Sequence, residues 1–172
     1  MKQTLKNWFA ALLLAVPMSA AVASGGHANY EKLDIDLRDQ VSLQHGAQIF
    51  TNYCLSCHSA SGMRFNRLKD IGLTEDEIKK NLMFTTDNVG DVMVAAMDPK
   101  DASKWLGAPP PDLTLIARSK GADYLYAYMR GFYKDPTRPN GWNNTVLAGA
   151  SMPHPLWEQQ GIQAVELAAK GQ

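Results

Sequence analysis

The sequence has no excess of charge of either sign. Its 172 residues include 17 basic and 17 acidic side chains, so the formal net charge at pH 7 is zero. Loss of an N-terminal segment containing Lys2 and Lys6 would leave the remaining chain slightly acidic. A protein that binds nucleic acid needs a basic surface, so we expect no nucleic-acid partner. Hydrophobic residues make up 45% of the chain, which excludes a disordered protein and indicates one globular domain.

Long hydrophobic runs are also missing. The N-terminal apolar segment, Phe9–Met18, follows two lysines and precedes the small residues Ala21–Ala23, which is the pattern of a secretory signal peptide. It is shorter than the roughly 20 apolar residues that a membrane-spanning helix requires. We therefore predict a signal peptide at residues 1–23 and an exported domain at residues 24–172. A retained N-terminal anchor is the alternative.

Cysteine is scarce, and this scarcity limits the possible metal and redox sites. A structural zinc site needs four ligands, but the chain has only Cys54 and Cys57, and its other histidines outside their motif are scattered, at His27, His45 and His154. A disulfide between the two cysteines would close a very short loop and contribute little stability. A thioredoxin-type dithiol belongs in a βαβ setting, whereas residues 42–53, before the first cysteine, have helical spacing.

The stretch Cys54-Leu-Ser-Cys57-His58 is typical of covalent haem attachment. Two thiols three positions apart can form thioethers with the two vinyl groups of one porphyrin. The imidazole that follows can then ligate the iron from one side. We predict one haem c, attached through Cys54 and Cys57, with His58 as the proximal iron ligand.

An electron-carrying haem needs a second axial ligand, commonly methionine or histidine. Most methionines beyond the N-terminal segment lie in apolar, helix-like stretches and are expected in the core. Met152 differs, because it follows a long irregular segment that starts at Lys134, and because Pro153 and Pro155 stiffen the backbone around it. Chemistry alone favours Met152 as the sixth ligand and leaves His154 as the alternative.

The remaining patterns are helical. Residues 73–84 begin with the capping-box pair Thr74 and Glu77. Residues 121–133 carry apolar side chains at spacings of three, four and seven, which predicts a helix with one buried face. The proline-rich residues 105–114 form a rigid loop whose carbonyls can accept the N–H of the proximal imidazole. No strand-like alternation of useful length is present, so we expect an all-α fold.

Three segments resemble the cytochrome c1 family, the haem subunit of quinol–cytochrome c oxidoreductase (the cytochrome bc1 complex). They are "CLSCHSASGMRFNRL", "KWLGAPPPDLTLIARSKGADYLYAYMRGFY" and "NGWNNTVLAGASMPHPLW". The resemblance covers about residues 30–161 and includes the ordered series PPDL, AR, DY, GFY and MP. It implies a class I cytochrome c-like haem domain with long loops, in which Cys54 and Cys57 hold the haem and His58 and Met152 ligate its iron.

The resemblance also implies supporting roles for four residues. Pro110 and Pro111 correspond to the loop against the proximal side of the haem. Arg118 corresponds to the partner of a haem propionate, and an arginine fork suits a carboxylate. Tyr124 corresponds to an aromatic residue near the same edge. A surface charge at Arg118 and an ordinary core position at Tyr124 are the alternatives.

The function that the resemblance implies is electron transfer, without enzyme activity of the chain by itself. The electron would arrive from a Rieske iron–sulfur protein and leave to a c-type cytochrome, beside cytochrome b at the periplasmic face of the bacterial cytoplasmic membrane. The family continues into a C-terminal helix and a membrane anchor, but residues 158–172 contain no long apolar run. We therefore expect both to be missing from this chain.

Other functions stay open at this point. A free periplasmic c-type cytochrome that serves another reductase is the main alternative. A haem enzyme or gas sensor with an open distal face is a second, and an exported disulfide-bonded binding module is a third.

Overall fold

The computed structural model describes residues 30–164. The expected signal peptide, residues 1–23, lies outside the described residues. The helices and strands are, in chain order, α2 (Gln40–Ile49), a π-helical turn (Phe50–Cys54), β1 (Ala60–Arg64), a 3-10 helix (Phe65–Ile71), α3 (Glu75–Asn81), β2 (Val92–Met93), α4 (Pro99–Leu106), α5 (Ile116–Lys120), α6 (Ala122–Arg130), β3 (Phe132–Lys134), β4 (Trp142–Asn144) and α7 (Trp157–Gln160).

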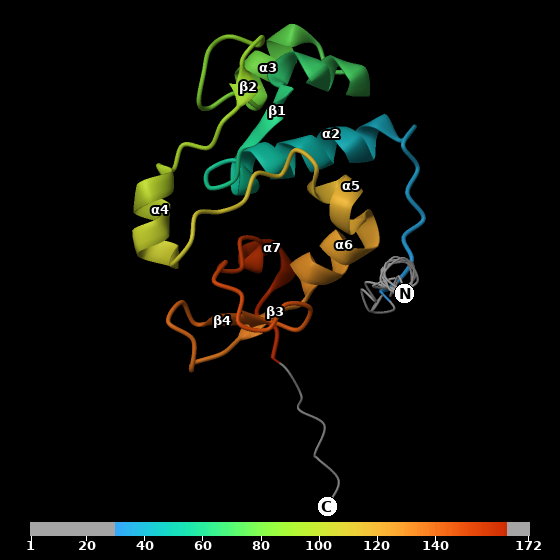
Figure 1. Ribbon diagram of the computed structural model, residues 1–172. Coiled ribbons are helices and arrows are strands. Elements are labelled where there is room, and N and C mark those ends of the chain that lie inside the picture. Colours follow the sequence, from blue (N-terminus) through green and yellow to red (C-terminus); the bar gives the residue numbers. More distant parts are fainter. Residues whose placement is uncertain (1–29, 165–172) are drawn as a thin grey trace, which may run out of the picture.

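Helix α2 crosses the middle of the molecule and separates two groups of elements (Figure 1). The β1–β2 pair and α3 lie above α2, and the β3–β4 pair and α7 lie below it. Helices α4 and α6 flank these groups on opposite sides. Within residues 30–164 we find no helix with the length and apolar character needed to cross a bilayer.

Two short antiparallel sheets within the described residues make the expectation of an all-α fold too simple. Strand β1 pairs with β2, and β3 pairs with β4 so that Phe132 lies opposite Asn144 and Lys134 lies opposite Trp142. The strands are two to five residues long. Such short strands leave no recognisable alternation in the sequence. The described residues thus combine helices with two small antiparallel sheets.

The helix expected over residues 121–133 ends earlier than its apolar spacing indicated. Helix α6 stops at Arg130, and the buried Phe132 begins strand β3. The residue between them, Gly131, lies where a Cβ atom would come within 2.9 Å of Asn144 Oδ1 and 2.8 Å of Thr145 Oγ1. Only glycine allows β4 to approach this closely, so the tertiary contact sets the end of the helix.

The helix starts follow the local sequence. Thr74 Oγ1 accepts a hydrogen bond from Glu77 N, and the Glu77 carboxylate accepts one from Thr74 N at 2.8 Å, so the predicted capping box is confirmed. The Asp98 carboxylate caps α4 by accepting hydrogen bonds from Lys100 N and Asp101 N, and Pro99 lies in the first turn. The capping box fixes the start of α3 and orients its one fully buried residue, Ile78, toward the core.

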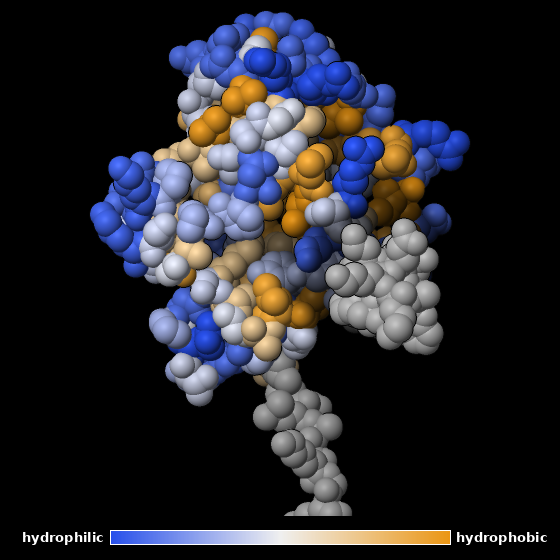
Figure 2. Space-filling view, viewed as in Figure 1, coloured by the Kyte–Doolittle hydropathy of each residue, from blue (hydrophilic) through white to orange (hydrophobic). Residues whose placement is uncertain are grey.

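Two groups of buried side chains position the site. The first, which we call the upper core, comprises Leu55, Ala60, Phe65, Ile78 and Met93. The second, the aromatic box, comprises Phe132, Trp142 and His154, in which the His154 ring contacts each of the other two. The upper core lies around the β1–β2 pair and the aromatic box around the β3–β4 pair. On the face shown in Figure 2, apolar surface gathers across the middle and hydrophilic surface lies at the top and along one side.

Candidate functional site

The two cysteines and the histidine after them lie on one tight turn at the end of α2. The carbonyl oxygen of Cys54 accepts hydrogen bonds from Cys57 N at 3.1 Å and from His58 N at 2.8 Å. Leu55, between the cysteines, is 1% exposed and anchors the turn in the upper core. The turn therefore presents two thiols and an imidazole from five consecutive residues.

The two thiols are free and half-buried. Burial, and the nearby thiol of Cys57, raise the pKa of Cys54 above its usual range. Catalytic dithiols have lowered thiol pKa values, so this environment does not suit a redox dithiol. Among residues 30–164 there is also no group of three or more potential His, Cys, Asp or Glu ligands. The raised thiol pKa argues against the dithiol alternative.

The imidazole of His58 is fixed by the proline loop, which spans residues 107–115 and not 105–114 as the sequence indicated, because Trp105 and Leu106 belong to α4. His58 Nδ1 lies 2.8 Å from the carbonyl oxygen of Pro111. A carbonyl can only accept, so Nδ1 carries the proton of this hydrogen bond, and in the neutral imidazole Nε2 keeps its lone pair. The side chain is buried, and within the described residues Nε2 makes no hydrogen bond. The prediction that this loop accepts the imidazole N–H is confirmed, and Nε2 is the nitrogen left for a metal.

Hydrogen bonds hold the proline loop against the start of β1. Leu113 N donates to the carbonyl of Ser59 at 2.7 Å. The Asp112 carboxylate accepts from Ser61 N at 2.8 Å and from Ser61 Oγ at 2.6 Å. Hydrogen bonds from Ser61, and from Thr114 in the loop itself, keep the pKa of Asp112 well below its usual range. The hydrogen bonds that join Asp112 and Leu113 to residues 59–61 hold the adjacent Pro111 carbonyl in place.

A glycine allows this close approach. Gly62 N donates to Thr114 Oγ1 at 2.9 Å. A Cβ atom at Gly62 would lie 2.5 Å from Thr114 Cγ2, a distance that side chains do not tolerate. The contact between β1 and the proline loop thus depends on the missing side chain at this position.

The methionine loop (residues 145–156) is tied to the segment that precedes β4. Arg138 donates to the carbonyl of Gly149 at 2.7 Å, and Asn140 donates to the carbonyl of Ser151 at 2.8 Å. Ser151 immediately precedes Met152. The sequence indicated only an irregular loop here, because turn-forming residues such as Asn140 do not reveal which distant carbonyls they bind.

Met152 also contacts helix α6. The Tyr128 hydroxyl donates to the Met152 sulfur at 3.6 Å. The backbone of Tyr128 is held in turn by Asn144, which is 1% exposed and donates to its carbonyl at 2.8 Å. The same amide accepts from Val146 N and Leu147 N at the start of the methionine loop. Sequence reasoning missed both Tyr128 and Asn144 as site residues.

His154, the rival sixth ligand, lies in the aromatic box. Its ring stacks on Phe132 at 4.9 Å and meets the edge of Trp142 at 5.2 Å. The side chain is 2% exposed, and both ring nitrogens lack a hydrogen-bond partner among the described residues. Burial lowers the pKa of His154, so the neutral imidazole is favoured. Its flat aromatic contacts suit a packing role.

The residues expected at the haem edge differ in their exposure and in their contacts. Arg118, on α5, is exposed and makes no ion pair or hydrogen bond through its side chain within residues 30–164. Tyr124 is half-buried in a row of rings, with Tyr30 edge-on at 5.6 Å and Tyr128 stacked at 6.0 Å. Pro110 is half-buried beside Pro111. The positions of these three residues do not depend on a contact between Arg118 and Tyr124.

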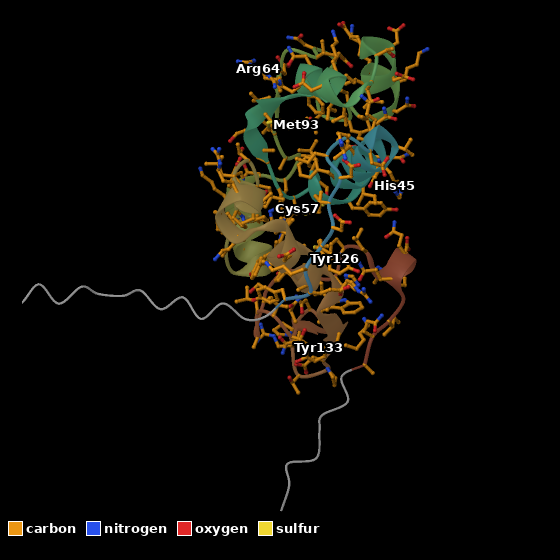
Figure 3. The ribbon with its side chains drawn as sticks, turned by 90° about the vertical axis from the view of Figure 1, so that its right-hand side faces the viewer. His45, Cys57, Arg64, Met93, Tyr126 and Tyr133 are labelled. Atoms are coloured by element: carbon orange, nitrogen blue, oxygen red, sulfur yellow. The ribbon has the colours of Figure 1, made fainter. Side chains whose placement is uncertain are left out.

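The parts of the expected site come from the two separate groups of elements. Figure 3 places Cys57 between Arg64 and Met93 above and Tyr126 and Tyr133 below. The methionine loop belongs to the lower group, between β4 and α7 (Figure 1). A haem fits this donor set: two free thiols, an imidazole with Nε2 available, and a thioether on the other group of elements. These are the residue types that covalent attachment and two axial bonds require.

Comparisons with known proteins agree with this chemistry. Residues 33–166 match the family described as the cytochrome C1 family. The ammonia monooxygenase gamma subunit of Nitrosomonas europaea is 48% identical over 157 residues, which cover 90% of this chain and 67% of that protein. Cytochrome c1 of Allochromatium vinosum is 48% identical over 155 residues, covering 90% of this chain and 63% of that protein.

A more distant relative extends the comparison. Cytochrome c1 of Rhodospirillum rubrum is 30% identical over 159 residues, covering 77% of this chain and 58% of that protein. The chain thus spans about two thirds or less of the length of these relatives. The family match covers most of the chain and includes every residue of the expected haem site. The chain belongs to the cytochrome c1 family.

Proposed function

We propose that this protein is the haem-bearing electron carrier of a quinol–cytochrome c oxidoreductase and is no enzyme by itself. Cytochrome c1 carries haem c covalently, and this chain has the two cysteines for it, Cys54 and Cys57. Haem c supplies a centre that gains and loses one electron without bond-making on a substrate. The observation that carries the proposal is the state of His58: Nδ1 is bound to Pro111, and Nε2 lies free beside two unpaired thiols.

The two axial ligands have opposite effects on the redox potential. His58 would hold the iron through Nε2, and the hydrogen bond from Nδ1 to Pro111 would make the imidazole more basic, which favours the ferric state. Met152 would supply its thioether, which favours the ferrous state and raises the potential. Support for Met152 over His154 comes from the tethered methionine loop and from the aromatic contacts that occupy His154.

Three further residues complete the proposed site. The Arg118 guanidinium is exposed and binds a haem propionate. Tyr124 lines the same edge and is held by its neighbouring rings. Pro110 stiffens the proline loop next to the His58 acceptor. With these roles the chain forms a class I cytochrome c-like haem domain with long loops.

The proposed partners follow from family membership. The protein accepts an electron from a Rieske iron–sulfur subunit and passes it to a c-type cytochrome. It sits beside cytochrome b at the periplasmic face of the bacterial cytoplasmic membrane. Support comes from two of the relatives above, which are named cytochrome c1, and from the export signal expected in the sequence.

Expression in a host that attaches haem tests the cofactor assignment. We expect a coloured protein whose mass includes one haem, and whose haem remains bound after denaturation. The ferric form will show the weak near-infrared band of a sulfur ligand, and the ferrous form will resist carbon monoxide. Met152→Leu should remove that band and open the sixth position. A colourless protein from such a host contradicts the proposal.

Isolation of the complex tests the partners. A tag on this chain, expressed in its own organism, should recover cytochrome b and a Rieske protein, and quinol should reduce its haem. Inhibition of quinol oxidation should abolish that reduction. Recovery of a coloured chain alone, still reduced by a different donor, favours the free periplasmic cytochrome.

A further inference from the structure

We infer that Tyr128 positions the thioether of Met152 and adjusts its binding to iron, through the hydrogen bond from the Tyr128 hydroxyl to the sulfur. The inference rests on the proposed role of Met152 as the sixth ligand. The 3.6 Å contact joins residues 24 positions apart, on α6 and in the methionine loop. Sulfur in a thioether has two lone pairs, so it can accept this bond with one and bind a metal with the other.

Several contacts fix the position of the Tyr128 ring. It stacks on Tyr124 with its centroid 6.0 Å away, and Phe132 meets it edge-on at 5.2 Å. Asn144 holds its backbone carbonyl at 2.8 Å. A ring packed against two others on an anchored backbone loses little further freedom when its hydroxyl binds the sulfur. The hydroxyl is therefore a pre-organised donor.

The methionine loop is restrained from the opposite side. Asn140 holds the carbonyl of Ser151, the residue before Met152. His154, two residues after it, is locked between Phe132 and Trp142. The backbone of Met152 is thus tethered on both sides, and its flexible side chain is the part that remains to be oriented. Tyr128 is the residue that contacts the sulfur itself.

The hydrogen bond has a defined electronic consequence. A donor at the second lone pair withdraws electron density from sulfur and weakens its donation to ferric iron more than to ferrous iron. The bond therefore raises the reduction potential. It also restrains the thioether, so an external ligand displaces it less readily. Both effects follow from one contact and are measured separately.

Tyr128→Phe tests the inference, because it removes the hydroxyl and keeps the ring contacts. We expect intact covalent haem, a retained near-infrared sulfur band and a lower midpoint potential. External imidazole should displace the thioether at about two- to tenfold lower concentration, the change that one neutral hydrogen bond contributes. Both measurements follow the haem spectrum and need no partner protein.

Tyr126→Phe is the matched control. Tyr126 lies on the same helix, but its hydroxyl accepts a hydrogen bond from Arg130 at 2.6 Å, and its ring lines a surface groove with Leu156 and Gln160. This variant should retain the wild-type potential and imidazole affinity. If Tyr128→Phe and Tyr126→Phe both behave like the wild type, the inference is wrong and the proposed function still stands.

Two measurements separate the remaining outcomes. If Met152→Leu leaves the near-infrared band unchanged, the sixth-ligand assignment itself fails, whatever Tyr128 does. If Tyr128→Phe does not take up haem, the wild type provides a second test. Its iron–sulfur stretching frequency is then measured in water and in heavy water. A shift on deuteration supports a hydroxyl proton on the sulfur, and no shift overturns the inference.

Discussion

His58 Nδ1 lies 2.8 Å from the carbonyl oxygen of Pro111, a residue 53 positions further along the chain. The acceptor is a backbone atom, so no side-chain deletion removes it. Its position depends instead on the stiffness of the proline loop and on the hydrogen bonds that hold the loop against β1. Changes in this loop should therefore alter the haem without touching a ligand.

Replacing Pro111 loosens the acceptor of the His58 hydrogen bond. Pro111→Ala should reduce the free energy of unfolding by about 0.4–1 kcal/mol, because the unfolded chain gains freedom. The midpoint potential should rise, since a weaker hydrogen bond makes the imidazole less basic and less able to stabilise ferric iron. A redox titration measures this shift, and Pro109→Ala, in the same proline run, should not produce it.

Adding a methyl group at Gly62 should push the proline loop away from β1. Gly62→Ala places Cβ 2.5 Å from Thr114 Cγ2, and overpacking of this kind costs about 1–3 kcal/mol. We expect a lower denaturation midpoint and a raised redox potential. The double variant with Thr114→Ser removes the clashing methyl and keeps the hydroxyl that binds Gly62 N. Failure of this second change to restore either property would show that the clash is not the cause.

Each single cysteine variant should keep one thioether bond to the haem. Cys54→Ala and Cys57→Ala should keep haem through the remaining sulfur, with the pyridine haemochrome band moved to longer wavelength because one vinyl group stays conjugated. The double variant should lose its haem on denaturation. Ser56→Ala, between the two cysteines, should match the wild type. Mass spectrometry of the denatured chain shows whether each variant still carries covalent haem. Full covalent haem in the double variant would contradict attachment through Cys54 and Cys57.

Substitution of His154 separates the two candidate sixth ligands. His154→Phe should keep the near-infrared sulfur band if Met152 is the sixth ligand, as proposed. The ring contacts with Phe132 and Trp142 remain, and two buried nitrogens without partners are removed. The free energy of unfolding should therefore change by less than about 1.5 kcal/mol. If His154 were the ligand, the wild type would lack this band and His154→Phe would open the sixth position to carbon monoxide.

Lowering the pH should weaken the ion pairs of Glu75, at the start of α3, over a defined pH range. Hydrogen bonds from Lys69 and Lys79 lower the pKa of Glu75 from 4.5 to about 2. The folded pKa is depressed, so the stabilisation is complete above pH 4.5 and is lost as the pH falls toward 2. The urea midpoints of the wild type and Glu75→Gln should differ slightly at neutral pH and converge in this range.

Salt provides the control for this effect. Glu75 is exposed, and its pairs with Lys69 and Lys79 lie at 2.8 and 2.9 Å on the surface. Such pairs contribute little and are screened by salt. In about 1 M salt the difference between wild type and Glu75→Gln should disappear at all pH values. A difference that persists in high salt would assign the effect to packing.

The haem motif and the helix starts could be read from the sequence because they are local. Cys54, Cys57 and His58 lie on one turn held by hydrogen bonds to a single carbonyl. Thr74 and Glu77 cap α3 through atoms three residues apart. Interactions of this range depend on neighbouring residue types and little else. The strands were missed for the converse reason, since β3 and β4 are three residues each and form only by pairing with each other.

The sequence by itself determined which chemistry this protein can perform: two thiols, an imidazole and a thioether are present in the order that haem attachment requires. Only the tertiary structure decided how those groups are held. The fit of Gly62 against Thr114, the enclosure of His154 by Phe132, and the contact of Tyr128 with Met152 join distant parts of the chain. Such contacts depend on the packed geometry of the whole domain, which local residue spacing does not encode.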